Sequence, residues 1–211
     1  MYILKPLSAN DFRKKNSSRL PIINKYYQRD TDVLKYLLGS MPYNTKAEEV
    51  FIKVVIIDFI YSTQLKQLIG GAGVHELVDL ILNVNFDNRV KTGDPTLVTD
   101  IANNNGGVNL FSFASKYCAL HSIYAHNKDD YSIYDSAVAR LFPKYTAEYH
   151  KNDPKITQIT ATQVECWRQN RDYKSINDAI GTFLDSIGVD RATYPWRRSD
   201  FDRIIWEQRN N

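Results

Sequence analysis

A lysine and an aspartate, Lys116 and Asp135, lie 19 residues apart (116 to 135) in otherwise apolar and aromatic surroundings. Ionisable residues in such surroundings are uncommon unless they are paired or functional. A neutral amine attacks a glycosidic carbon with oxocarbenium character, and a carboxylate opposite stabilises the positive charge that develops on the sugar. Burial, or the positive end of a helix, lowers the proton affinity of a lysine enough for this role. A lysine and a carboxylate are thus chemically suited to cleave an N-glycosidic bond, with a Schiff base at the lysine and strand cleavage by elimination.

Two short amphipathic segments carry these residues. Residues 111–122 and 131–142 each place apolar side chains at helical spacing, and the polar loop 126–130 separates them. The pattern predicts two helices, with Lys116 near the start of the first and Asp135 near the start of the second. Each residue also has a structural interpretation. In that interpretation Lys116 extends its amine to solvent, and Asp135 caps the helix that follows it.

The lysine and aspartate segments resemble those of the helix-hairpin-helix DNA glycosylases of the endonuclease III and 8-oxoguanine DNA glycosylase type. That family carries a lysine at the head of the second hairpin helix, then a Pro-Val-Asp-x-x-Val type segment whose aspartate is catalytic. Lys116 matches the lysine, and Ser132-Ile133-Tyr134-Asp135-Ser136-Ala137-Val138 looks like the aspartate segment, at a similar separation. One feature departs from the family. The Leu-Pro-Gly-Val-Gly type turn before the lysine is absent, because residues 110–115 contain no glycine and Gly106 and Gly107 lie earlier.

The stretch from Thr45 to Ile69 is the strongest helix signal and predicts a central helix. Thr45 and Glu48 form a potential capping box, and the residues that follow are apolar nearly all round. In the resembling family the corresponding helix runs into a Leu-Ser-Ala-Gln type turn, whose glutamine or asparagine fills the gap left by a flipped base. Gln64 matches that place, which implies a DNA-binding role. A Ser-Thr-Gln tripeptide is also an ordinary helix end.

Four residues beside this pair are candidates for the base pocket. In the functional interpretation an extruded base stacks on the rings of Tyr117, Tyr131 and Tyr134, and Cys118 lines the same pocket. The alternative is that all four are core residues, since aromatics are frequent in this chain. The resemblance suggests 8-oxoguanine as a possible base. His121 and His126 are candidates for acid-base roles, and the favoured alternative is that each is a helix cap or a surface residue.

The rest of the chain also favours helices. Glycines at 70, 71 and 73 predict a flexible connection, and residues 144–159 a surface excursion that contains the one plausible strand, 155–160. Further helices are expected at 33–38, 74–84, 94–101, 160–169, 175–187 and from Ser199 to the end. The predicted fold class is all-α, a two-lobed glycosylase-like fold with a helix-hairpin-helix-like element. The expected lobes are 45–142 and 1–44 plus 143–211.

Composition sets broad limits on the class of protein. The chain has 211 residues, 43% of them apolar, a net charge of +3 and a pI near 8.7, which indicates a globular protein and is compatible with nucleic acid. The basic cluster Arg13, Lys14 and Lys15 is interpreted as a solvated face, with phosphate contact as the alternative. Two cysteines, Cys118 and Cys166, cannot hold an iron-sulfur cluster, so we expect no metal and no cofactor.

Location and function follow as expectations. The apolar run 54–57 is far too short to span a bilayer. This favours a cytoplasmic protein of the bacterial cytosol or nucleoid, without membrane contact. The sequence predicts a monomeric DNA glycosylase of base excision repair, with lyase activity at Lys116, acting on DNA that carries a damaged or modified base. A catalytically inactive binding module for modified DNA, and a helical protein-interaction domain without a DNA role, are the alternatives. Turnover on damaged duplexes separates the first two, and salt-dependent DNA binding separates both from the third.

Overall fold

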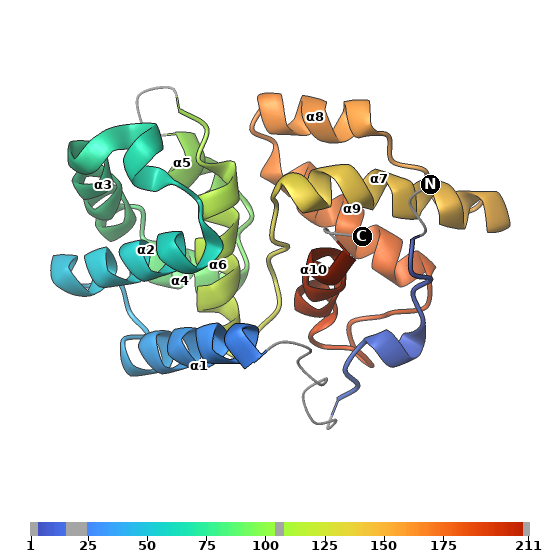
Figure 1. The fold of residues 1–211 in the computed structure, drawn as a ribbon, viewed down its shortest axis with the longest axis horizontal. Helices are drawn as coiled ribbons and strands as arrows, with labels where there is room; N and C mark the ends of the chain where they lie inside the picture. The colour runs from blue at the N-terminus through green and yellow to red at the C-terminus, as the bar shows by residue number, and fades with distance from the viewer. Residues whose placement is uncertain (1–3, 16–24, 104–107, 209–211) are drawn as a thin grey trace. The chain divides into compact units, whose positions relative to one another are not determined.

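The computed structural model describes residues 4–15, 25–103 and 108–208. Within these ranges the chain forms ten α-helices and one short 3-10 helix, without a strand, and the all-α prediction is confirmed (Figure 1). The strand predicted at 155–160 is wrong for this part of the chain. The Ile156 amide donates to the Asp153 carbonyl, and the Ile159 amide donates to the Thr146 hydroxyl. A turn and a side chain therefore use the groups that a strand partner would need.

The chain divides into two compact units. Unit 1 comprises Met1–Leu20 and Ser132–Asn211, and unit 2 comprises Pro21–Tyr131. The expected lobes differ from these units because 21–44 belongs with the hairpin region and 132–142 does not. Unit 2 contains α1 (Lys25–Ser40), α2 (Ala47–Tyr61), α3 (Leu65–Asn83), α4 (Phe86–Thr92), α5 (Thr96–Asn103) and α6 (Phe111–Tyr124). Unit 1 contains η1 (Ala9–Asp11), α7 (Ser136–Asn152), α8 (Ala161–Gln169), α9 (Tyr173–Ser186) and α10 (Arg197–Gln208).

Helix α6 is the central helix of unit 2. It packs against α1, α2, α4 and α5 (Figure 1). Its side chains are buried from Phe113 through Ser122. The prediction that the helix beginning at Thr45 would be central is wrong. Helix α2 starts after Lys46 as its N-cap and leaves Ile52 and Phe59 exposed on its outer face. The helix that carries Lys116 is therefore the one that the core surrounds.

The glycine-rich stretch lies inside α3. Gly70 has φ 70° and ψ 175°, which interrupts the helical backbone, yet helix continues on both sides from Leu65 to Asn83. A positive φ of this size is readily adopted only by glycine. The expected flexible connection is thus a kink within one helix.

Helix α7 differs from its predicted extent at both ends. It begins at Ser136, directly after Asp135, because residues 128–134 are not helical. It then runs through Pro143 to Asn152, where a surface excursion was predicted. Tyr145 is buried and Thr146 is fully buried in this stretch. Burial of these side chains stabilises the helix beyond Pro143, although helix propensity alone predicts that a helix ends near a proline.

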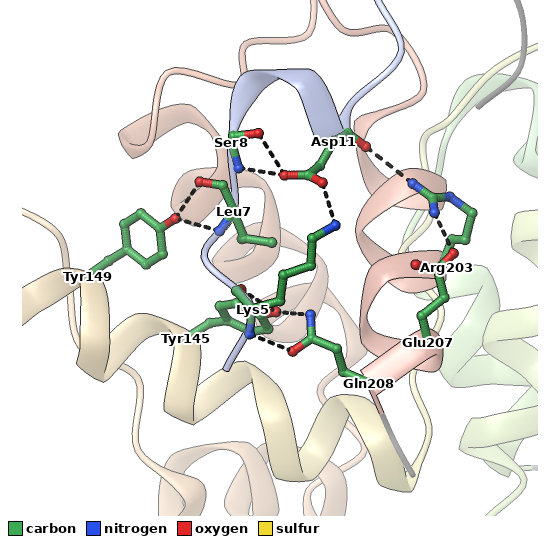
Figure 2. Close-up of polar contacts among 9 residues, drawn as sticks. All are labelled: Lys5, Leu7, Ser8, Asp11, Tyr145, Tyr149, Arg203, Glu207 and Gln208. Atoms are coloured by element: carbon green, nitrogen blue, oxygen red, sulfur yellow. Dashed lines mark hydrogen bonds and ion pairs between the residues drawn. The ribbon is translucent and has the colours of Figure 1, made fainter. Parts of the chain in front are cut away.

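The first described residues are attached to α7 and α10 of unit 1 (Figure 2). The Tyr149 hydroxyl donates to the Leu7 carbonyl at 2.8 Å and accepts from the Leu7 amide at 3.0 Å. The Lys5 amide donates to the Gln208 side chain at 3.1 Å, and the Tyr145 hydroxyl donates to the Lys5 carbonyl at 3.1 Å. These bonds explain why the start of the chain belongs to the same unit as its end.

Candidate functional site

Lys116 lies in the second turn of α6 and is 3% exposed. Its Nζ donates to the Ser112 hydroxyl at 2.9 Å, one turn earlier on the same helix. It also lies 5.6 Å from the centroid of the Tyr61 ring, at the end of α2. An ammonium over an aromatic face is attracted by the negative charge of the ring surface. The interpretation of Lys116 as a lysine extending to solvent is wrong, and its amine is held among α6 and α2 side chains.

The turn between α2 and α3 has an unusual backbone. Ser62 and Gln64 both have positive φ, 51° and 62°, which is uncommon for residues other than glycine and is often associated with functional sites. The Asp58 carboxylate stabilises the turn, because it accepts from the Thr63 hydroxyl at 2.5 Å and from the Leu65 amide at 3.1 Å. Gln64 itself is exposed. The turn therefore presents Gln64 on a backbone that Asp58 holds in place.

Tyr61 links this turn to the lysine. It is the last residue of α2, three positions before Gln64, and its ring is the one that lies over the Lys116 ammonium. Gln64 and Lys116, which the sequence singled out in separate segments, are thus linked through Tyr61 within unit 2. Tyr61 and Ser112 are neighbours of Lys116 that the sequence reasoning missed. Ser112 had a signal, since residues four apart on a helix face each other, whereas Tyr61 had none.

Asp135 is the N-cap of α7 in unit 1. Its Oδ1 accepts from the Ala137 amide at 2.9 Å and from the Val138 amide at 3.0 Å. The residue has extended backbone angles and is half-buried. The structural interpretation of Asp135 as a helix cap is confirmed. A capping role and a chemical role are compatible, because the two amides fix the orientation of the carboxylate and the helix dipole favours its negative charge.

Tyr117 and Cys118 lie in the core of unit 2 and are fully buried. The Tyr117 hydroxyl donates to the Asn44 side chain at 2.7 Å, and its ring packs edge-on against Phe86. Burial raises the pKa of the Cys118 thiol well above its ordinary value, which keeps the thiol protonated and unreactive. The core position of both residues is the alternative that the sequence left open for them.

Tyr131 and Tyr134 are buried on either side of the division between the units. Tyr131 is 1% exposed, and its hydroxyl donates to the backbone carbonyls of Arg89 at 3.2 Å and Asp94 at 3.0 Å in unit 2. Tyr134 is 4% exposed in unit 1, where burial raises the pKa of its hydroxyl to about 12. Tyr131 therefore anchors the end of unit 2, and Tyr134 directly precedes the aspartate.

A second lysine is buried near α6. Lys53 on α2 is fully buried, and its Nζ donates to the carbonyls of Met41 at 3.0 Å and Tyr43 at 2.7 Å and to the Asn44 side chain at 3.0 Å. Burial lowers the pKa of this amine to about 8. With three oxygen acceptors around it, Lys53 holds the loop before α2 in place. Its burial could be suspected from its position inside an apolar run, but its acceptors could not.

The glycine-poor hairpin before Lys116 is described in part. Helices α5 and α6 pack against each other, and the Asn109 side chain accepts from the Phe111 amide at 2.9 Å at the start of α6. Gly106 and Gly107, which lie earlier than the glycines of the family turn, are outside the described residues.

Within the described part of the chain, none of the helices combines the length and the apolar character needed to cross a bilayer.

The chain belongs to the HI_0787_N family, whose description is an N-terminal domain and which matches residues 10–130, more than half of the sequence. No curated protein and no solved structure matches the chain. The family match covers α1 to α6 of unit 2, so it includes Gln64 and Lys116. Asp135 lies beyond it.

Proposed function

We propose that this protein is a DNA glycosylase that removes a damaged or modified base and then cleaves the strand through a Schiff base at Lys116. The observation that carries the proposal is the contact between the Lys116 Nζ and the Tyr61 ring. It connects a buried lysine with the strained, exposed turn at Gln64, and this combination suits an enzyme that holds an opened duplex beside its nucleophile. In this proposal the fold is glycosylase-like, and α5 and α6 form its helix-hairpin-helix element.

The proposed reaction assigns one role to each ionisable residue. The unprotonated Lys116 amine attacks C1′ of the deoxyribose, and the base departs with the electron pair of the N-glycosidic bond and takes up a proton. The C1′–O4′ bond then breaks as the attacking amine passes a proton to O4′, which leaves a protonated Schiff base at C1′. Loss of a C2′ proton then expels the 3′ phosphate, and water releases the lysine. Asp135 stabilises the positive sugar while the base departs.

Local structure supports these roles in two ways. The Ser112 hydroxyl and the Tyr61 ring restrict the Lys116 amine to one direction, which reduces the entropy lost on reaching an attack geometry. The amides of Ala137 and Val138 restrict the Asp135 carboxylate in the same sense. Tyr117 and Tyr131 are left out of the proposed base pocket, because their hydroxyls are used inside unit 2.

Borohydride trapping tests the proposal. The protein is incubated with duplexes that carry one abasic site or one modified base, 8-oxoguanine first, and a borohydride reductant. We expect a covalent adduct with the wild-type protein, because reduction converts the Schiff base to a stable amine. Lys116→Gln should abolish the adduct, whereas Lys66→Gln, which changes an exposed lysine of α3, should leave it intact.

The aspartate is tested in the same assay. Asp135→Asn keeps a good N-cap and removes the charge, so it should retain trapping on the abasic duplex and lose base excision. Absence of an adduct on every duplex contradicts the proposal. If salt-dependent DNA binding then remains, the protein is a binding module for DNA, and if it does not, a protein-interaction role is favoured.

A further inference from the structure

The backbone just before Asp135 is held by a buried polar cluster in unit 1. The Ser132 amide donates to the Asn177 Oδ1 at 2.8 Å, and the Tyr173 hydroxyl donates to the Ser132 carbonyl at 2.7 Å. Both partners lie on α9, and all three residues are buried. Both backbone hydrogen-bonding groups of Ser132 are thus used by side chains that lie 41 and 45 residues further along the chain.

Arg198 of α10 completes the cluster. Its Nη1 donates to the Ser132 hydroxyl at 2.6 Å, to the Asn177 carbonyl at 2.7 Å and to the Asn177 Oδ1 at 3.1 Å. The guanidinium passes directly over Gly181, where an added Cβ would lie 2.5 Å from its Nη2. The absence of a side chain at Gly181 is what allows Arg198 to cross α9 and reach Ser132.

Buried polar groups of this kind are costly unless every partner is present, and they specify one arrangement when it is. Here the arrangement concerns a segment of four residues. Ser132 is fixed by Asn177, Tyr173 and Arg198 at one end, and Asp135 is fixed by the start of α7 at the other. Few backbone torsions lie between these two points, so the position of the carboxylate depends on the cluster.

We infer that Asn177 is a positioning residue for Asp135, with Arg198 holding Asn177 in its acceptor geometry. The inference rests on the proposed function, in which Asp135 stabilises the positive sugar. Stabilisation of that charge depends on the placement of the carboxylate, whereas formation of the Schiff base on an already abasic sugar depends on Lys116 in the other unit. Loss of Asn177 should therefore slow base excision much more than trapping.

The test compares two rates in the full-length protein. Single-turnover excision is measured on a duplex with one 8-oxoguanine, and borohydride trapping on the same duplex with one abasic site. Asn177→Ala should slow excision on the order of a hundredfold, because small displacements of a reacting group have effects of that size. Trapping should change little. Asn177→Asp keeps an acceptor oxygen beside Arg198 and should restore excision. Gly181→Ala, which pushes Arg198 away, should lower excision in the same direction.

Controls distinguish positioning from loss of fold. Asp178→Ala changes the adjacent, exposed residue of α9 and should leave both rates unchanged. Hydrogen exchange of the Ser132 amide should speed up in Asn177→Ala, while the thermal unfolding profile keeps the form that it has in the wild-type protein. Equal losses of excision and trapping, or unchanged excision in a folded Asn177→Ala protein, overturn the inference alone. Absence of excision and trapping by the wild-type protein on all duplexes overturns the proposed function and the inference with it.

Discussion

Tyr131 and Ser132 are consecutive residues that are anchored in different units. The Tyr131 hydroxyl donates to the Arg89 and Asp94 carbonyls of unit 2, whereas the Ser132 amide donates to Asn177 of unit 1. The chain thus passes from one unit to the other across a single peptide bond with a hydrogen-bonded residue on each side. In the proposed enzyme this is the connection between the helix of the lysine and the helix of the aspartate.

Gln64→Ala tests the DNA-binding role of the turn between α2 and α3. The side chain is exposed, so removal should leave the unfolding temperature unchanged. Binding to a lesion-containing duplex should weaken roughly tenfold, because one or two hydrogen bonds to the opened duplex are lost. Fluorescence anisotropy measures the affinity, and Gln67→Ala, an exposed glutamine in the next turn, is the matched control. A strong loss of stability in the Gln64 variant would instead make the residue structural.

His121 makes the stability of unit 2 depend on pH. The residue is fully buried, and its Nδ1 lies 2.8 Å from the Tyr117 carbonyl, so the expectation of a cap or surface residue is wrong. Burial, together with the charge of Lys53, lowers its pKa from 6.5 to about 3. Between these values the unfolded chain binds a proton that the folded chain does not, so the stabilising contribution is complete above pH 6.5 and is lost as pH falls.

The expected size of this effect can be measured directly. Titration of His121 should lower the free energy of unfolding by roughly 3 kcal/mol between pH 6.5 and pH 4. Denaturant unfolding at a series of pH values gives the slope. In His121→Phe the ring shape is kept and the titrating group is removed, so the slope over this range should become clearly shallower. An unchanged slope would mean that His121 is accessible to protons in the folded chain.

Arg13→Ala should destabilise unit 1. Arg13 donates from its amide and its Nε to the Asp200 carboxylate, both at 2.8 Å, and its guanidinium lies 5.7 Å from the centroid of the Trp196 ring. Burial raises the pKa of Asp200, and the Arg13 charge opposes that rise. The free energy of unfolding should fall by about 2 kcal/mol at pH 7, because the buried Asp200 carboxylate loses its charged hydrogen-bond partner. Thermal unfolding measures it.

The same variant has a predicted pH dependence. Without Arg13 the folded-state pKa of Asp200 rises further, so the destabilisation should shrink as pH falls and the carboxylate takes up a proton. Lys15→Ala, which changes an exposed residue of the same basic cluster, should have almost no effect on unfolding. An equal loss in both variants would argue that the basic cluster acts through net charge and not through the Asp200 pair.

Local patterns in the sequence determined much of the helical content. Helix α6 occupies the stretch that apolar spacing predicted, and α8 begins at Ala161, after Thr160 as its N-cap in a capping box with Gln163. The Asp94 side chain accepts from the Thr96 amide at the start of α5, within the stretch 94–101 where a helix is predicted. Such features are readable because the hydrogen bonds involved join residues two to four positions apart.

Tertiary structure decided which faces are buried and what each polar side chain meets. Apolar character marked α2 as the central helix, yet α6 is central, because burial depends on how many neighbours cover a helix. The ring of Tyr61 over Lys116 and the bond of Asn177 to Ser132 join residues 55 and 45 positions apart (61 to 116, 132 to 177). Periodicity and propensity describe only the immediate neighbours of a residue, so contacts at these separations follow from the packing of whole helices.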